Sequence, residues 1–373
     1  MRVKVTSFEG QSGLKKLAPA WRKLSERLET RRHFHCVEWY LALADTLERK
    51  AGITVTCLAI SSSDELLGVF PFRAARVELA GVPLHALQLL SDAWEAETAR
   101  DLVLAPAQAQ DEFFQAFVHL LDQNDASWDV ISLRGILDDS VAAAALHASP
   151  DLPCVRTPGG AWGRVEFVSC GATDRPFDRL SKGFRQNLRT AHNHLKSSAV
   201  SFSSTRSPHG LAAAYPKFLA VESSGWKGVE GTSVMKSPTA DSFLRNLISQ
   251  FGSSGGCEIH LMHIEERTVA ALFCVVTDDI CYILKTAYDE AFARMSPGHL
   301  TLERLLQQRG ATGRLQVVTP YNAPPWFRAW RPDEALGIHN AYVFRPSQQG
   351  RELAVRVHST LSRANASALQ ERR

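Results

Sequence analysis

A short turn between an apolar strand and an amphipathic helix is the part of the sequence best suited to bind an anion. It contains Ser296-Pro297-Gly298, which supplies a polar cap, a φ angle preset near helical values and a residue without a side chain. The range that follows carries an apolar stripe: Leu300, Leu302, Leu305 and Leu306. Unpaired N–H groups and the helix dipole attract negative charge, so we expect an anion site at this turn. The alternative is an ordinary strand-to-helix connection.

A second stretch, Ser181–Lys196, places positive charge along one side of a predicted helix. Basic residues recur there beside an apolar seam with the same helical spacing. The basic row is Arg185, Arg189, His192 and Lys196, and the seam is Phe184, Leu188, Ala191 and Leu195. The stretch contains no carboxylate, which points toward an anion-facing surface. A solvated surface helix stays open as the alternative.

A glycine-rich segment after a predicted helix could also contact a ligand. Gly225, Gly228 and Gly231 surround Trp226 and Lys227, and such glycines break a helix and indicate an exposed, adaptable loop. Trp226 could stack on a ligand and Lys227 could pair with it. The alternative is a tryptophan that anchors the loop to the core.

The amino-acid composition limits the classes of protein to which the chain can belong. The chain has 373 residues, 45% hydrophobic and 22% charged, which is enough to build a core over one large or two ordinary domains. A net charge of +3 does not indicate a DNA-binding protein. No apolar run is long enough for a transmembrane segment, and the N-terminus lacks the pattern of a signal peptide.

The cysteines and histidines do not form a recognisable metal site. Seven scattered cysteines without a C-x-x-C pair are typical of reduced, buried thiols, so we expect a cytoplasmic protein. His33, His35 and Cys36 lie close together, but no second cluster completes a zinc set. We therefore expect no metal.

The order of predicted elements indicates a mixed α/β protein with two domains. Two apolar runs, Ile53–Ile60 and Leu66–Phe72, predict a hairpin in the first half, and a turn-rich segment near residue 160 marks its end. The second half contains an antiparallel meander that leads into the turn described above. Its strands are predicted at Glu258–Ile264, Thr268–Thr277 and Ile280–Tyr288. The predicted domains are residues 1–160 and 161–373.

Several of these motifs together resemble the CelD/BcsL-type acetyltransferases of the GNAT class. They are ELLGVFPF in the first half, then FRQNLRTAHNHL, ESSGWKG and YILKTAYDEAFARMSPGHLTLERLL in the second. The nearest architectural relatives of that family are the FemAB peptidyltransferases. The resemblance implies an N-terminal GNAT-like domain and a C-terminal GNAT acyltransferase domain in a FemAB-like tandem, with mixed α+β sheets.

The resemblance also implies where an acyl-CoA donor, such as acetyl-CoA, would bind. Its diphosphate would lie on backbone amides from about Arg294 to Leu300, and its thioester beside the strand ending at Lys285–Tyr288. The implied donor-binding residues are Lys285, Tyr288, Arg294, Met295, Ser296, Gly298, His299 and Leu300. Pro297 removes one amide donor, so the cradle departs from the family's usual turn.

An acceptor amine must be neutral to attack a thioester, so a general base is useful. The candidates are Asp289, Glu222 and His299; Asp289 comes first because it ends the strand before the turn. Its alternative role is a cap on the following loop, and positioning alone can also suffice for catalysis. The candidate substrate-binding residues are Arg185, Arg189, Trp226, Lys227 and Trp326. Trp326 stands in PYNAPPWFRAW, where the family commonly has an acidic residue, a glycine and a Tyr-Lys pair.

Three functions fit these patterns. The first is acyl-CoA-dependent N-acyl transfer, with O-acyl transfer possible, to a small-molecule or glycan-precursor acceptor for the envelope or a polysaccharide. The second is FemAB-like transfer from aminoacyl-tRNA, for which the basic row of Ser181–Lys196 would supply part of the RNA contact. The third is a non-catalytic GNAT-like partner in exopolysaccharide biosynthesis.

Overall fold

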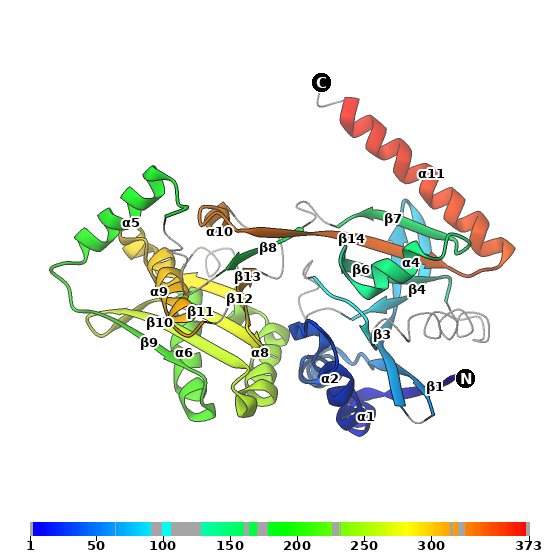
Figure 1. The fold of residues 1–373 in the computed structure, drawn as a ribbon, viewed down its shortest axis with the longest axis horizontal. Coiled ribbons are helices and arrows are strands. Elements are labelled where there is room, and N and C mark those ends of the chain that lie inside the picture. The colour runs from blue at the N-terminus through cyan, green and yellow to red at the C-terminus, as the bar shows by residue number, and fades with distance from the viewer. Residues whose placement is uncertain are drawn as a thin grey trace. The chain divides into compact units, whose positions relative to one another are not determined.

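The structure of the chain is a computed structural model. It describes residues 3–63, 65–90, 99–105, 128–159, 164–169, 178–225, 231, 233–313, 316–319 and 325–370. The chain forms two compact units (Figure 1). Unit 1 comprises residues 1–30, 53–163 and 336–373, and unit 2 comprises residues 31–52 and 164–335. The predicted division at residue 160 would have put segment 31–52 in the first domain and segment 336–373 in the second; the structure places segment 31–52 in unit 2 and segment 336–373 in unit 1.

Unit 1 is built on a mainly antiparallel sheet with the strand order β1-β2-β3-β4-β6-β14. Short strands β5 and β7 pair with β3 and β14. Its elements are β1 (Val3–Glu9), α1 (Gly10–Ser25), β2 (Thr56–Ser62), β3 (Glu65–Leu79), β4 (Val82–Leu89), β5 (Val103–Leu104), β6 (Val130–Leu137), α4 (Val141–His147), β7 (Cys154–Pro158), β14 (Glu334–Phe344) and α11 (Gln348–Gln370).

The hairpin predicted in the first half is confirmed as β2 and β3. Their register pairs Thr56 with Phe72 and Ser62 with Glu65. Alternate residues of both strands enter a core that α4 completes from the other side. Strand β14 joins this sheet by pairing with β6, which explains why the last segment of the chain belongs to unit 1.

Unit 2 has the strand order β8-β13-β12-β11-β10-β9. Among the pairings of the described residues in this unit, the pairing of β12 with β13 is parallel and the others are antiparallel; α9 connects β12 to β13 by a crossover. Its elements are η1 (His33–His35), α2 (Val37–Ala51), β8 (Arg164–Ser169), α5 (Lys182–His194), β9 (Val200–Thr205), α6 (Pro208–Ser224), η3 (Val234–Lys236), α8 (Pro238–Phe251), η4 (Gly252–Ser254), β10 (Cys257–Ile264), β11 (Arg267–Thr277), β12 (Ile280–Tyr288), η5 (Glu290–Met295), α9 (Pro297–Ala311), β13 (Gln316–Thr319) and α10 (Pro325–Arg328).

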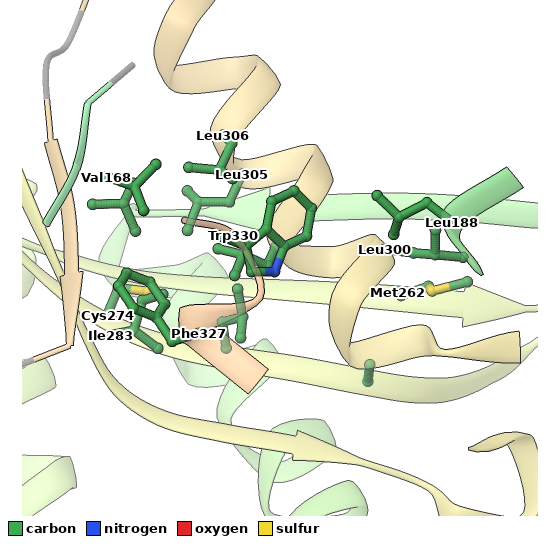
Figure 2. Packing of buried hydrophobic residues seen from close by; sticks show 14 of the residues in the cluster. Val168, Leu188, Met262, Cys274, Ile283, Leu300, Leu305, Leu306, Phe327 and Trp330 are labelled. Carbon is green, nitrogen blue, oxygen red and sulfur yellow. The ribbon is translucent and has the colours of Figure 1, made fainter. Parts of the chain in front are cut away.

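The predicted meander is confirmed as β10, β11 and β12, and helices cover both faces of it. Leu272 and Cys274 belong to a buried cluster that contains the leucines of α9. Figure 2 shows Cys274 of this cluster together with Leu188 of α5 and Trp330. The intervening residue Phe273 contacts Tyr215 and Phe218 of α6 on the opposite face. The apolar stripe predicted at 300–306 therefore holds α9 on the sheet, which fixes where its N-terminus lies.

The early segment 31–52 packs on unit 2 through specific long-range contacts. Trp39 lies edge-on against Phe243 of α8, with ring centroids 5.1 Å apart. The side-chain amide of Asn246 donates to Asp45 and Thr46 of α2 at 2.9 Å. Contacts of this kind join residues about two hundred positions apart, so helical periodicity alone does not reveal them. Among the helices of the described ranges, none has the length and apolarity needed to cross a membrane.

Candidate functional site

The strand β12 carries a bulge close to the end that leads into the predicted turn. Phe273 of β11 is opposite Lys285, while the next residue, Cys274, is opposite Ile283, so Leu284 is an extra residue in β12. The parallel register with β13 covers only Ile280–Tyr282 of β12. The part of β12 from Ile283 to Tyr288 therefore extends past the described register with β13 and leads directly to the turn.

Asp289 caps the turn between β12 and α9. Its Oδ1 accepts a hydrogen bond from the backbone N–H of Ala291 at 3.1 Å, and its Oδ2 pairs with the guanidinium of Arg267. The side chain of Asp289 is 8% exposed. Arg267 also lies over the ring of Phe292, 5.2 Å from its centroid. Both carboxylate oxygens thus have protein partners, an arrangement suited to holding η5 in place.

The start of α9 differs from the starts of α5, α6 and α8, although the N-cap of α2, Cys36, also makes no side-chain cap bond. In α5, α6 and α8 an N-cap serine accepts a hydrogen bond from a first-turn N–H: Ser181, Ser207 and Ser237. The N-cap of α9 is also a serine, but Ser296 has a φ of 47° and makes no side-chain cap bond. Pro297 has no N–H, and the N–H of Leu300 bonds to the carbonyl of Ser296.

Two backbone donors are consequently presented together at this helix start. Within the described part of the chain, the N–H groups of Gly298 and His299 have no recorded acceptor. Both residues are half-buried, so neither belongs to the fully buried core of unit 2. Such a pair, reinforced by the helix dipole, is chemically suited to a phosphate oxygen.

The protein itself does not require glycine at position 298. A Cβ built there would lie 3.6 Å from Cδ1 of Tyr288, which is ordinary van der Waals contact. The backbone of Gly298 is helical and does not adopt a positive φ. A residue without a side chain at this place leaves room for a ligand to approach the amides. The residues present therefore fit a diphosphate.

His299 is held by two aromatic side chains. The indole N–H of Trp330 donates to its Nδ1 at 3.2 Å, and the ring of Phe184 lies edge-on at a centroid distance of 5.0 Å. Burial lowers the pKa of His299, which favours the neutral ring. Because an indole can only donate, Nδ1 is the acceptor and the neutral ring carries its proton on Nε2. In this arrangement Nε2 is a hydrogen-bond donor rather than a base.

Glu222 lies at the end of α6, near the end of β12. It is 2% exposed, and its Oε2 accepts a hydrogen bond from the backbone N–H of Val234 at 2.8 Å. A Cβ at Gly225 would lie 3.2 Å from the carbonyl oxygen of Tyr288, so the two segment ends are close neighbours. Tyr288 is 39% exposed at this junction.

Arg185, Arg189 and His192 of the predicted basic row lie on α5, which packs on η5 and α9, whereas Lys196 lies beyond the C-cap of this helix at Leu195. Arg185 is half-buried and Arg189 is exposed. Both line a shallow groove with a volume of 580 Å³, together with Lys182, Gly183 and Gln186. His192, another member of the row, pairs at 2.7 Å with Glu303 of α9. Arg294, in the adjoining turn, is also exposed.

The structure brings most of the predicted residues to one end of unit 2. The remaining residues predicted to bind the donor, Lys285 and Met295, are both half-buried, and Met295 packs against the core below α9. Trp326 also packs against that core, beside Phe327. Trp226 and Lys227 lie outside the described residues. Sequence reasoning missed Trp330 as the partner of His299, although the WFRAW motif was the available signal.

Comparison with known proteins agrees with this architecture. Residues 182–319 match the family model described as "Acetyltransferase (GNAT) domain". A search of curated proteins gave no match. Among solved structures, FemX is 10% identical, with a TM-score of 0.58 over 92% of this chain and 98% of FemX.

A protein described as the C-terminal domain of a lysylphosphatidylglycerol synthetase from Agrobacterium fabrum is also similar. It is 10% identical, with a TM-score of 0.54 over 93% of this chain and 96% of that one. A conserved protein of unknown function from Bacteroides thetaiotaomicron gives a TM-score of 0.50 at 9% identity, covering 88% and 97% of the two chains. The mixed α/β, two-domain GNAT fold predicted from the sequence is thus confirmed.

Proposed function

We propose that the protein is an acyl-CoA-dependent N-acyltransferase whose donor site lies at the start of α9. The observation that carries this proposal is the pair of uncapped amides at Gly298 and His299, within the segment that matches the GNAT model. The motifs quoted above favour the CelD/BcsL-type branch, and acetyl-CoA is the simplest donor to test.

The donor's diphosphate would be bound by the two amides and by the side chain of Arg294, which is exposed beside them. The amides contribute donors fixed by the helix, so little ordering is needed when the anion binds. The exposed part of Tyr288 lies next to Gly298 and would contact the same molecule.

In the reaction, the acceptor nitrogen would form a bond to the acyl carbon and the bond from that carbon to sulfur would break. The proton that the nitrogen loses would pass, directly or through water, to the departing thiolate, which leaves as the thiol of CoA. Because the indole N–H of Trp330 keeps Nδ1 of His299 as an acceptor, His299 would donate a hydrogen bond through Nε2 to an oxygen of the acyl-CoA. Asp289 would position η5 through Ala291 and Arg267. Catalysis by orientation of the two substrates would then carry most of the rate enhancement.

The acceptor would approach the basic side of α5. Arg185 and Arg189 line the groove there and would pair with a phosphate or carboxylate of the acceptor. An envelope or polysaccharide precursor that carries an amine and an anionic group has the matching chemistry.

The second candidate function is transfer from aminoacyl-tRNA. The similarity to FemX over nearly the whole chain motivates it, and the basic groove on α5 would contact the RNA backbone. A GNAT-like partner without activity is the third.

Thermal unfolding in the presence of each donor separates these functions. Acetyl-CoA at a hundred times its dissociation constant should stabilise the protein by about 2.7 kcal/mol. Stabilisation by aminoacyl-tRNA alone would instead support the second function. A lack of response to both would contradict both enzymatic functions.

A further inference from the structure

The last turn of α9 contains a buried arginine whose donors are not all used. Arg309 is 3% exposed, and its Nη2 forms an ion pair with Oε2 of Glu258 at 3.0 Å. Among the described residues, its Nη1 has no hydrogen-bond partner, so the donors of the guanidinium are only partly used. Buried N–H groups without acceptors are costly, so such a guanidinium is a strong indication that something accepts from it.

The carboxylate beside it already has other partners. Oε1 of Glu258 pairs with Arg206, and Oε2 is 3.0 Å from Nε2 of His260. Burial by itself raises the pKa of Glu258, but the hydrogen bond from His260 and the charges of Arg309 and Arg206 outweigh it and bring the pKa to about 2. The cluster therefore holds one carboxylate against two permanent cations, which leaves an excess of positive charge.

These residues line a cavity with a volume of 540 Å³ inside unit 2. It lies between the end of β9, strand β10 and the last turn of α9. Its other lining residues are small, polar or apolar: Ser204, Thr205, Leu305, Gln308, Ala311 and Thr312. A cavity of this size accommodates a small organic molecule with room beyond its charged group.

We propose that this cavity binds a small organic anion through a carboxylate or phosphate group seated on Nη1 and Nη2 of Arg309. The planar fork of a guanidinium matches two oxygens of either group. Arg206, whose side chain is 51% exposed, lies at the mouth as a second cation. Gln308 and Thr205 supply polar contacts for the remainder of the ligand.

This site is separate from the proposed donor site, although both lie on α9. Gly298 and Arg309 are eleven positions apart in a continuous helix, which corresponds to roughly 16 Å along the axis. Inorganic phosphate could bind at either end of α9, so the experiment must tell the two ends apart.

The test is titration calorimetry of the full chain with inorganic phosphate and, separately, with acetate at constant ionic strength. We expect at least one of them to bind, with phosphate alone indicating a phosphorylated ligand and acetate alone a carboxylate. Arg309→Lys, which keeps the charge but removes the fork, should weaken that binding at least tenfold. Gly298→Asp should remove any phosphate bound at the donor site and leave the binding that depends on Arg309 in place.

Arg206→Gln provides a variant at an exposed position, where folding is not at risk, and should weaken binding about threefold or more. Absence of binding by both anions would overturn the proposal. Wild-type affinity for the anion in both Arg309→Lys and Arg206→Gln would also overturn it. Loss of anion binding in Gly298→Asp alone would overturn it as well, because the anion would then bind at the donor site.

Discussion

A single substitution, Gly298→Asp, should separate stability from donor binding. The new carboxylate would stand in the first turn of α9, where a negative charge stabilises a helix by about 0.3–1 kcal/mol. No protein atom obstructs it, since the nearest contact of a Cβ is the ring of Tyr288 at 3.6 Å. We therefore expect unfolding temperatures equal to or above those of the wild-type protein.

The same carboxylate should strongly weaken acetyl-CoA binding. A unit negative charge about 5 Å from a phosphate costs roughly 3 kcal/mol at an effective dielectric constant near 20. That free energy corresponds to a loss of affinity of more than about 100-fold. Gly298→Ala adds only a methyl group, so we expect it to weaken binding by less than about tenfold while stabilising the helix by roughly 0.5–1 kcal/mol.

The chain offers a matched control in His209→Asp. The sequence Ser207-Pro208-His209 occupies the same positions at the start of α6 that Ser296-Pro297-Gly298 occupies in α9. His209 is exposed, and Ser207 caps the first turn there. Calorimetric titration with acetyl-CoA should give wild-type affinity for His209→Asp. Equal affinity of Gly298→Asp and His209→Asp would refute the placement of the diphosphate.

Three further predictions concern other parts of unit 2. Asp289→Asn should cost about 0.5–1 kcal/mol of stability, because it loses the ion pair with the largely exposed Arg267, while kcat stays near wild type; a large fall in kcat would make Asp289 the base. Replacing both Arg185 and Arg189 by Gln should weaken acceptor binding about tenfold at low salt and little at high salt. Unchanged binding in low-salt titrations would show that this groove does not bind the acceptor. Burial, and then the charges of His35 and Arg32, lower the pKa of His33 from its ordinary 6.5 to about 3 in the folded protein. Between these two pH values the unfolded chain binds a proton at His33 that the folded protein does not. The free energy of unfolding should therefore fall as the pH decreases from 6.5 to about 3. The slope should approach 1.4 kcal/mol per pH unit, and a His33→Phe variant with the same pH slope in denaturant titrations would contradict this.

Local patterns were sufficient to predict much of the site's framework. Alternation and turn residues predicted the meander, and the leucine spacing predicted the helix that follows it; both agree with β10–β12 and α9. These elements depend on near neighbours in the sequence, which is why periodicity reveals them.

The partners of the functional side chains could not be predicted in the same way. Asp289 meets Arg267 across a strand pair, and His299 meets Trp330, which lies just after α10. The assignment of segment 31–52 to unit 2 depends on contacts with α8. Each of these pairings is set by tertiary packing, and a single sequence carries no local signal for it.

A crystal structure of the protein with acetyl-CoA tests the central claim most directly. We expect diphosphate oxygens within hydrogen-bond distance of the backbone nitrogens of Gly298 and His299. A diphosphate bound elsewhere on the protein, with these two nitrogens in contact only with solvent, would contradict it.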